Sequence, residues 1–423
     1  MPSSEGESGA FSSLGSGEAF DRSMRRSPKV HLHVERTRRA CNFKDVQLGY
    51  VRVAIAAECF LPQRNGVTNS VLRILEHLKD HGHETLVLTP GQGPSSEAGT
   101  AVERIRSVPL PVHRDLPVAL PTRRVDDVLR EFAPDIVHLA APAVLGPAAA
   151  RVARDMGTPV VAIYQTDFAG FARSYCLGLT RPVVWRMLRR AHRDADLTLA
   201  PSTSAAWQLA GQGIGPVALW SRGVDSDLFH PRRRSDLLHH RLAPSGQVVV
   251  GYMGRLASEK RVQLLAALQR VPHIKLVVVG DGPARRRLER RLPRAEFLGW
   301  RSGVDLATVV ASLDVFVHTG PHETFCQAIQ EALASGVPVV APAQGGPLDL
   351  VRHGENGWLF PPESADLMAQ AVADLAGDAH LRRAMGERAR ASVEHRTWGL
   401  VNGQLLDHYR RLIGTPSRRR LAA

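Results

Sequence analysis

Two glutamates, Glu323 and Glu331, stand eight residues apart in the segment HTGPHETFCQAIQE. The pattern predicts a loop that carries Glu323 and a helix over 325–335 that carries Glu331. Eight helical residues rise about 12 Å, whereas the acid and base of a glycosidase stand about 5–9.5 Å apart. We therefore expect the carboxylates to hold hydroxyl groups at opposite ends of one long ligand, such as a sugar and a ribose. The amides of 324–327 would meet phosphates between them. A helix with one capping and one solvated glutamate is the structural alternative.

A second candidate segment, GRLASEK, directly follows a predicted strand over 248–253. It places Arg255 at the carboxyl end of that strand and Lys260 in the first turn of a helix predicted over 258–270. A guanidinium fork and a compact ammonium suit a diphosphate. A lysine in a first helical turn opposes the macrodipole unless an anion lies nearby. The alternative is a solvated lysine beside Glu259.

A third candidate is the loop NGVTN at 65–69, between the first predicted strand and its helix. Gly66 would allow the backbone to approach a ligand, and the helix N-terminus favours an anion. A simple turn glycine is the alternative. The sequence contains no G-x-G-x-x-G, because the glycines of 280–282 are followed by Arg285 where the third glycine would stand. A nicotinamide-dependent dehydrogenase is therefore poorly supported.

Strands and helices alternate along most of the chain, and this alternation predicts parallel, doubly wound sheets. The rhythm begins with a buried strand over 51–57 and a helix whose apolar face includes Val71 and Leu78. It restarts after the polar stretch 229–246. The fold class is therefore α/β, with two Rossmann-like doubly wound parallel-sheet domains and a cleft between them. The other strands are expected at 85–88, 135–139, 159–164, 196–200, 217–220, 248–253, 274–279, 296–298, 315–318 and 337–341, and the other helices at 122–132, 147–156, 182–193, 203–210, 258–270, 284–292, 304–312 and 325–335.

The expected domain organisation has five parts. They are a disordered extension (1–49), an N-terminal Rossmann-like domain (50–228), a C-terminal Rossmann-like domain (229–395), a helix crossing back to the N-terminal domain (396–415) and a disordered tail (416–423). The extension is rich in Gly, Ser and Arg and lacks helical or strand periodicity. Because the domain opens abruptly at Tyr50, the alternative is that residues 1–49 are not part of the native protein.

Composition narrows the class of protein further. The chain has 423 residues, of which 44 % are hydrophobic, and no apolar run reaches the ~18–20 residues of a membrane span. The first 20 residues hold no apolar segment of signal-peptide length, and the four cysteines form no CxxC pair, so a cytoplasmic protein is expected. The net charge of +13 favours anionic partners, although no nucleic-acid motif accompanies it.

Three further patterns are weaker. His77 and His81 have helical i,i+4 spacing but no evident third ligand, so we expect no metal site and no cofactor. Cys326, near a helix start, is a candidate nucleophile, but a small apolar filler explains it better. The arginine-rich helix candidate over 182–193, which includes Trp185 and Leu188, is either a solvated face or a surface for an anionic membrane.

Taken together, these segments resemble the retaining glycosyltransferases of family 4, which have the GT-B fold. The resemblance runs from about Val51 to Tyr409. Within the family, several stretches are most similar to GDP-mannose-dependent α-mannosyltransferases that act on bacterial envelope glycolipids, although sulfoquinovosyl-lipid synthases share similar stretches. The segments that carry the resemblance are AECFLP (57–62), NGVTNSVLR (65–73), YQTD (164–167), WSRGVD (220–225), GDGP (280–283), FLG (297–299), ASGVPVV (334–340) and GGP (345–347), with the E-x7-E segment and the Arg255/Lys260 pair.

The resemblance implies that the N-terminal domain (50–228) binds the acceptor and that the C-terminal domain (229–395) binds the nucleotide sugar. It also implies roles for individual residues. Arg255 and Lys260 match the diphosphate clamp, and Glu323 matches the carboxylate that contacts the donor sugar. Glu331 matches the carboxylate that holds the ribose, and the amide of Gly66 would meet the phosphate.

By the same resemblance, Phe325 and Cys326 form the backbone turn beside the sugar, and the nucleobase would lie near Phe297 and Leu298. Many relatives carry histidine where this chain has Gln165. The tentative contacts with the donor sugar or the acceptor are Asn69, Gln165, Asp167 and Arg222, and Asp167 is not taken as a covalent nucleophile.

The implied reaction is a metal-independent transfer of mannose from GDP-mannose to a lipid-linked or glycolipid acceptor, with retention of configuration. It would occur at the cytoplasmic face of the membrane, with peripheral contact to anionic lipid. Two alternatives are a transferase that uses a UDP-sugar (glucosyl-, N-acetylglucosaminyl- or sulfoquinovosyl-type) and a GT-B sugar-nucleotide epimerase or hydrolase. A third is a non-catalytic protein that binds nucleotide or lipid.

Overall fold

The structure is a computed structural model, and it describes residues 49–63, 65–109, 117–120, 123–166 and 181–414. The expected disordered segments, 1–49 and 416–423, lie outside these ranges except for Gly49. Asp167 also lies outside them.

The N-terminal part of the chain forms an eight-stranded sheet in the order β10-β9-β8-β7-β1-β2-β4-β3. Neighbouring strands are parallel except for β3 and β4, as in the pairing of Ala54 with both Leu86 and Val137. The prediction of a parallel sheet is confirmed. The strands are β1 (Arg52–Ala57), β2 (Glu84–Pro90), β3 (Ser96–Glu97), β4 (Thr100–Ile105), β7 (Ile136–Ala140), β8 (Val160–Ile163), β9 (Leu197–Ala200) and β10 (Val217–Leu219), and β5 (Ser107–Pro109) pairs with β6 (Pro117–Ala119) in a separate ribbon.

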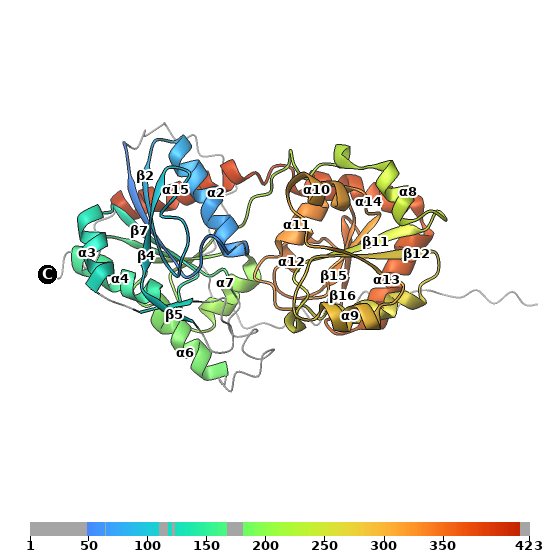
Figure 1. Ribbon diagram of the computed structural model, residues 1–423, viewed down its shortest axis with the longest axis horizontal. Helices are drawn as coiled ribbons and strands as arrows, with labels where there is room; N and C mark the ends of the chain where they lie inside the picture. Colours follow the sequence, from blue (N-terminus) through green and yellow to red (C-terminus); the bar gives the residue numbers. More distant parts are fainter. Residues whose placement is uncertain (1–48, 64, 110–116, 121–122, 167–180, 415–423) are drawn as a thin grey trace, which may run out of the picture. The chain divides into compact units, whose positions relative to one another are not determined.

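Helices cover both faces of this sheet, as a doubly wound topology requires (Figure 1). One face packs against α2 (Gly66–Asp80) and the C-terminal helix α15 (Trp398–Gly414), and the other packs against α3 (Arg123–Phe132) and α4 (Leu145–Met156). The remaining helices of this part are α6 (Arg181–His192) and α7 (Thr203–Ala210).

The C-terminal part forms a second, fully parallel sheet in the order β13-β12-β11-β14-β15-β16. Its strands are β11 (Val248–Met253), β12 (Ile274–Val279), β13 (Glu296–Gly299), β14 (Val315–Val317), β15 (Val339–Pro342) and β16 (Gly357–Phe360). The α-helices of this part are α8 (Asp236–Leu242), α9 (Arg285–Arg291), α10 (Gly303–Ala311), α11 (Gln327–Ala334), α12 (Pro347–Leu350), α13 (Ala365–Gly377) and α14 (Ala379–Val393), with a short 3-10 turn at Pro231–Arg233.

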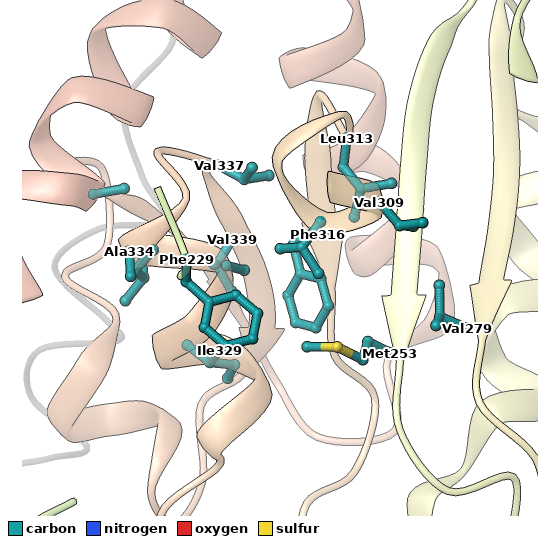
Figure 2. Close-up of a cluster of buried hydrophobic side chains, with 14 of the residues drawn as sticks. Phe229, Met253, Val279, Val309, Leu313, Phe316, Ile329, Ala334, Val337 and Val339 are labelled. Carbon is teal, nitrogen blue, oxygen red and sulfur yellow. The ribbon is translucent and has the colours of Figure 1, made fainter. Parts of the chain in front are cut away.

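The helix that carries Glu331 is anchored by its apolar side. Ile329 and Leu333 of α11 are fully buried in a cluster that also contains Phe229 and Phe316 (Figure 2). Because an interior at native density resists displacement, this core fixes α11 relative to β14. The loop between β14 and α11, which carries Glu323, is therefore held at both ends.

The chain passes between the two sheets at two adjacent segments. Val224 and Thr397 form a parallel bridge, and the Val224 amide donates to the Arg396 carbonyl at 2.8 Å. A Cβ atom at Gly223 would lie 2.5 Å from Trp398 Cα, so only glycine permits this close approach. Beyond this point α15 packs against α2, and Asn402 Nδ2 donates to the Arg73 carbonyl at 2.8 Å.

The structure corrects the sequence reading at two positions near the site. The helix expected over 258–270 consists of two 3-10 segments, Ser258–Lys260 and Val262–Arg270, separated by Arg261 at a φ of 50°. The helix expected over 325–335 begins two residues later, at Gln327. Within the described ranges no helix combines the length and the apolar character that crossing a bilayer requires.

Candidate active site

The site is built around the carboxylate of Glu323, which lies in the loop after β14. Its Oε1 atom accepts a hydrogen bond from Lys260 Nζ and lies 3.2 Å from Nε2 of His318. The side chains of Lys260 and Glu323 are 22 % and 15 % exposed. Thr319 Oγ1 also donates to the Lys260 carbonyl at 2.7 Å. The 3-10 turn after β11 and the loop after β14, far apart in sequence, are thus joined at the carboxyl ends of two neighbouring strands.

Glu323 is ionised at neutral pH. Burial by itself raises the pKa of its carboxyl, but Lys260 and His318 outweigh that effect and bring the pKa to about 2. Burial lowers the pKa of the Lys260 ammonium, and the Glu323 carboxylate more than offsets this, so the pKa of Lys260 lies above its usual value. The pair is therefore a fixed carboxylate and a fixed ammonium, and neither exchanges a proton readily near pH 7.

Two glycines let the backbone of another loop press against the segment around Glu323. The Gly346 amide donates to the Glu323 carbonyl at 2.8 Å. A Cβ atom at Gly346 would lie 2.1 Å from the Phe325 carbonyl oxygen, and one at Gly345 would lie 2.6 Å from that of Glu323. A side chain at either position would clash with the backbone around Glu323. Glycine at both positions therefore allows the GGP segment (345–347) to contact and support the loop that carries Glu323.

Phe325 and Cys326 complete the turn into α11. Phe325 is buried, and Cys326 has a φ of 83°, which is unusual for a residue with a side chain. Burial raises the pKa of the Cys326 thiol well above its usual value, and the negative charge of the nearby Glu323 carboxylate raises it further. The thiol is thus protonated at neutral pH, and the interpretation of Cys326 as a packed apolar side chain agrees with its burial better than a thiolate nucleophile does.

A buried arginine connects three loops of the N-terminal sheet. Arg222 Nη1 donates to the Gly66 carbonyl at 2.8 Å, and Nη2 donates to Gln165 Oε1 at 2.6 Å. Burial lowers the pKa of Arg222 to about 10, partly offset by Glu323, so the guanidinium remains charged at neutral pH. Gly66 is the first residue of α2, where the amide has no acceptor within the helix. Asn69, in the next turn of α2, is exposed.

The segment between the two glutamates donates three hydrogen bonds to these loops, all to main-chain oxygens. Thr324 Oγ1 donates to the Gln165 carbonyl, Gln330 Nε2 to that of Arg222 and Gln327 Nε2 to that of Gly223, each at 3.0 Å. Gln330 is fully buried. Because the acceptors are main-chain oxygens, these hydrogen bonds fix the backbone of the two loops whatever side chains those residues carry.

Glu331, by contrast, has no cationic partner among the described residues. Burial raises the pKa of its carboxyl to about 8, and a hydrogen bond from Gln327 opposes this only in part. The carboxyl is thus largely protonated at neutral pH in the absence of a ligand. A buried carboxyl without a counter-charge is stabilised by groups that donate hydrogen bonds to it, and the hydroxyls of a ligand are such donors.

Arg255 lies in a loop shaped by close backbone contacts. A Cβ atom at Gly280 would lie 2.0 Å from the Gly254 carbonyl oxygen, and one at Gly282 would lie 2.5 Å from that of Leu256. The Arg255 side chain is exposed, and no described residue forms an ion pair or hydrogen bond with it. Its guanidinium is available to an anionic ligand.

Phe297 and Leu298 lie in β13, the edge strand of the C-terminal sheet, and both are partly exposed. Neither residue forms a hydrogen bond with Lys260 or Glu323 in the described part of the chain. The structure thus places these two residues on a different element of the same sheet.

One group of potential metal ligands occurs among the described residues: His318, Glu323 and Cys326, whose ligand atoms lie within 4.8 Å of one another. The donor set fits a divalent cation poorly. The Glu323 oxygen already accepts from the Lys260 ammonium, whose charge would repel a metal ion. The Cys326 thiol is protonated, whereas metals bind the thiolate.

Sequence reasoning assigned the main-chain amides of 324–327 to the site, but it missed the side chains of His318, Thr324, Gln327 and Gln330. His318 follows a strand directly, and its position at the carboxyl end of β14 could have identified it. The two glutamines look like ordinary helical residues in the sequence, because their partners are main-chain atoms more than 100 residues away.

A further missed residue is Glu58, directly after β1. Its carboxylate accepts hydrogen bonds from four successive amides at the start of α4, at 2.7–3.2 Å. A carboxylate is favourable at a helix N-terminus, so Glu58 fixes the loop that leads to Gly66. The four amides belong to Ala143, Val144, Leu145 and Gly146.

Comparison with known proteins agrees with this arrangement. Residues 64–228 match the family described as Glycosyltransferase Family 4, and residues 236–392 match the Glycosyl transferases group 1 family. The chain is 47 % identical over 371 residues to a GDP-mannose-dependent alpha-mannosyltransferase of Mycobacterium tuberculosis, covering 86 % of this chain and 97 % of the relative. It is 46 % identical over 374 residues to a protein of the same name from Corynebacterium glutamicum (87 % and 91 % covered). It is 32 % identical over 349 residues to the sulfoquinovosyl transferase SQD2 of Arabidopsis thaliana (79 % and 68 % covered).

Solved structures show the same fold. The Anabaena protein HepE in complex with UDP superposes with a TM-score of 0.71 at 20 % identity, covering 86 % of this chain and all of that one. A sucrose-phosphate synthase from Thermosynechococcus elongatus has the same TM-score and identity, with 86 % and 99 % covered. The resemblance found in the sequence is confirmed: the chain belongs to glycosyltransferase family 4 and has the GT-B fold.

Proposed function

We propose that this glycosyltransferase moves mannose from GDP-mannose to a lipid-linked or glycolipid acceptor, with retention of configuration and without a metal ion. The observation that carries the donor is the near full-length identity of 47 % to a GDP-mannose-dependent alpha-mannosyltransferase. The acceptor class is supported by weaker similarity, 29 % over 382 residues, to a phosphatidyl-myo-inositol mannosyltransferase of Mycobacterium tuberculosis.

In this proposal, the diphosphate of the donor is held by two cations and two sets of amides. The exposed guanidinium of Arg255 and the ammonium of Lys260 contact its oxygens, and the amides of Gly66 and of the α11 N-terminus donate to them. Glu331 accepts hydrogen bonds from the ribose hydroxyls, and Phe297 and Leu298 lie beside the base. The role of Arg255 is supported by its exposed guanidinium, to which no described residue offers a partner.

The same proposal gives Glu323 the donor sugar. Because its pKa is about 2, Glu323 is a hydrogen-bond acceptor for sugar hydroxyls and does not deliver a proton to the leaving group. As the bond between the sugar and the phosphate breaks, negative charge grows on the departing GDP, and the nearby cations and amides stabilise it. A departing phosphate oxygen then accepts the proton of the attacking hydroxyl on the same face of the sugar. Gln165, Arg222 and Asn69 are the proposed contacts nearest the sugar and the acceptor, together with Asp167.

Metal independence is proposed from the chemistry of the residues around Glu323. Lys260 supplies the positive charge that a metal would otherwise provide next to the diphosphate. The carboxylate nearest to it is already engaged by that ammonium. Because the donor would form in the cytoplasm and the acceptor is a lipid, we propose a cytoplasmic enzyme that acts at the inner face of the membrane.

The direct test has two steps. Thermal unfolding with GDP, UDP and ADP identifies the base, and we expect GDP to raise the melting temperature most, since a ligand that binds only the folded state stabilises it. Radiolabelled GDP-mannose is then incubated with membrane extracts, with and without EDTA. Transfer of mannose to a lipid fraction, unaffected by EDTA, is expected, and an EDTA-sensitive transfer would refute the metal-free mechanism.

A UDP-sugar transferase is a second candidate, and the 32 % identity to a sulfoquinovosyl transferase favours it over other classes. Preferential stabilisation by UDP would identify it. An epimerase or hydrolase would convert the donor with no acceptor present, so the products formed from GDP-mannose alone separate that class from a transferase. A nucleotide-binding protein without activity would show the thermal shift and no product.

A further inference from the structure

Helix α6 presents a stripe of arginines that the proposed reaction does not use (green in Figure 1). Arg186, Arg189, Arg190 and Arg193 follow the spacing i, i+3, i+4 and i+7, which places them on one side of a helix. All four are exposed. Arg193 stands one residue beyond the end of α6.

The opposite side of α6 is packed into the protein. Val184, Trp185 and Leu188 are 2–5 % exposed and lie in a cluster with Leu209 and Ile214. The apolar face that sequence analysis left open for a membrane is therefore occupied by the protein's own core. Trp185 and Leu188 cannot insert into a bilayer without unfolding this region.

The positive charges of the stripe are not compensated within the described part of the chain. No carboxylate there forms an ion pair with any of the four, and Arg189 donates only to the neutral Gln212 side chain at 3.2 Å. The nearby Asp194 is already paired with Arg154 at 2.7 Å. Like charges at i,i+4 destabilise a helix by a few tenths of a kcal/mol, and a mixed surface normally intersperses both signs.

The stripe borders two hollows. A cavity of about 790 Å³ is lined by the four arginines, Met187, His192 and the loop 213–215. A smaller one of about 260 Å³ lies between α6 and the start of α4, and Arg151 adds a further positive charge to it. Met187 lines both cavities and is 52 % exposed. His192 contributes no charge, because burial lowers its pKa to about 4.

We propose that the arginine stripe of α6 docks the protein on the anionic headgroups of a lipid bilayer. Guanidinium groups bind phosphate through paired hydrogen bonds, and the hollows between them accept headgroups that project from the surface. Because the apolar face is buried, docking is electrostatic and superficial, with Met187 as the apolar contact. The inference rests on the proposed function only for the advantage of docking, which brings the enzyme close to a lipid acceptor. The binding itself is a property of the chain without nucleotide.

The test compares two charge-matched double variants. Arg186→Glu with Arg190→Glu reverses two charges of the stripe at i,i+4 spacing. Arg286→Glu with Arg290→Glu reverses two exposed charges at the same spacing on α9, where no carboxylate of the described residues forms an ion pair with either. Each protein is sedimented with vesicles of phosphatidylglycerol and phosphatidylcholine, and with vesicles of phosphatidylcholine alone, in the absence of nucleotide.

We expect the unaltered chain to bind the anionic vesicles and not the zwitterionic ones, and to be released by salt. The α6 variant should bind at least tenfold more weakly, since each basic residue near an anionic surface contributes about 1 kcal/mol, and the α9 variant should bind within about twofold of the unaltered chain. Equal losses in both variants, equal binding to both vesicles, or salt-insensitive binding would overturn the proposal. So would competition by soluble glycerol phosphate as effective as that by vesicles, which would indicate a pocket for a small anion.

Two controls separate this result from a folding defect and from failure of the proposed function. Circular dichroism and the melting temperature report whether the α6 variant folds; if it does not, the single variants Arg186→Gln and Arg193→Gln, which only neutralise charge, take its place and must each weaken vesicle binding. Stabilisation by GDP should be the same in all variants, because the stripe lies outside the nucleotide-binding residues. Loss of vesicle binding with GDP stabilisation intact supports the docking surface, whether or not mannose is the sugar transferred.

Discussion

Arg222 Nη2 lies 2.6 Å from Gln165 Oε1, and the same guanidinium reaches the carbonyl of Gly66 through Nη1. These three residues follow β10, β8 and β1, so one buried side chain joins three loops at the carboxyl edge of the N-terminal sheet. The carbonyl of Arg222 in turn accepts from Gln330, one residue before Glu331. The residues resembling a phosphate-binding glycine and a sugar contact therefore share one hydrogen-bond network, and Gln330 joins that network to the helix that carries Glu331.

Replacing Arg222 with methionine should weaken this network and the fold together. The Gly66 carbonyl, which is partly buried, and the buried Gln165 Oε1 would both lose their donor, and an unsatisfied buried group costs about 1–3 kcal/mol. Relief of the buried charge offsets part of this, so we expect a net loss of about 1–3 kcal/mol in the free energy of unfolding in urea. Arg222→Lys keeps the charge but reaches only one acceptor. The free energy of unfolding of this variant should therefore lie between those of the unaltered chain and of Arg222→Met. A methionine variant as stable as the unaltered chain would contradict the network.

Much of the fold could be predicted from the sequence, because parallel strands buried on both faces appear as short apolar runs. The strand expected over 51–57 is observed at Arg52–Ala57, and that over 248–253 is observed without change. The strand Thr100–Ile105 went unpredicted, since its sequence TAVERI alternates apolar and polar residues and includes two charges. The helices Ala365–Gly377 and Ala379–Val393 also went unpredicted.

The candidate site was accessible in part for a related reason. Glu323, Glu331, Arg255 and Lys260 stand at strand ends or in the helices that follow, and their spacing is visible in the sequence. The turn geometry at Lys260 could not be predicted, because Arg261 adopts a left-handed conformation although it is neither glycine nor asparagine. The partnership of Gln330 with Arg222 joins residues 108 apart, which no local pattern encodes.

Lys260→Met should reduce transfer by about 10²-fold or more, because in the proposed mechanism one cation that stabilises the developing charge on the leaving group is lost. Lys260→Arg should retain more activity than methionine, since it keeps the charge. The measurement is the initial rate of mannose transfer at saturating donor, with the melting temperature as the check on folding. Turnover within twofold of the unaltered chain would remove Lys260 from the clamp.

The same substitution should change the acid stability. The pKa of Glu323 is about 2 in the folded chain against an ordinary value of 4.5, so its contribution to stability is complete above pH 4.5 and is lost as the pH falls toward 2. Without Lys260 the dominant effect on this carboxyl is burial, which raises its pKa. We therefore expect the stability difference between the unaltered chain and Lys260→Met to shrink as the pH is lowered from 5 to 3. Urea unfolding at several pH values measures it, and a constant difference would disprove the coupling.

Glu331 contributes to stability with the opposite pH dependence, and it should also make nucleotide binding depend on pH. Its folded pKa of about 8 lies above the ordinary 4.5, so its contribution to stability without ligand is complete below pH 4.5 and is lost as the pH rises through 8. Ribose hydroxyls that donate to the carboxylate favour its ionised form. Affinity for GDP should therefore increase from pH 6 to 8 and then level off, with release of a proton below pH 8.

Calorimetry in two buffers of different ionisation enthalpy detects that proton. Glu331→Gln removes the titrating group at nearly constant volume, so the variant should bind GDP more weakly and release no proton through this site. Gln327→Leu provides a further check, because a hydrogen bond from Gln327 lowers the pKa of Glu331; its loss should move the pH at which affinity levels off upward. Unchanged GDP affinity in Glu331→Gln would exclude the ribose assignment.

Gly346→Ala tests whether the GGP segment positions the loop that carries Glu323. The added Cβ would lie 2.1 Å from the Phe325 carbonyl oxygen and 2.4 Å from Phe325 Cα, so the backbone of one loop must move.

Gly403 provides the matched control, because it lies inside α15 and a Cβ there meets nothing within 4 Å. Alanine at Gly403 should stabilise the protein by about 0.5–1 kcal/mol through helix propensity, with no change in turnover. Alanine at Gly346 should destabilise it by about 1–3 kcal/mol, as overpacking does. It should also lower kcat more than it raises KM for the donor, because in the proposed mechanism Glu323 contacts the sugar, while Lys260 and Arg255 lie on other elements. Equal behaviour of the two variants in urea unfolding and in steady-state kinetics would show that the loop adapts without loss and that the close contact has no role in positioning Glu323.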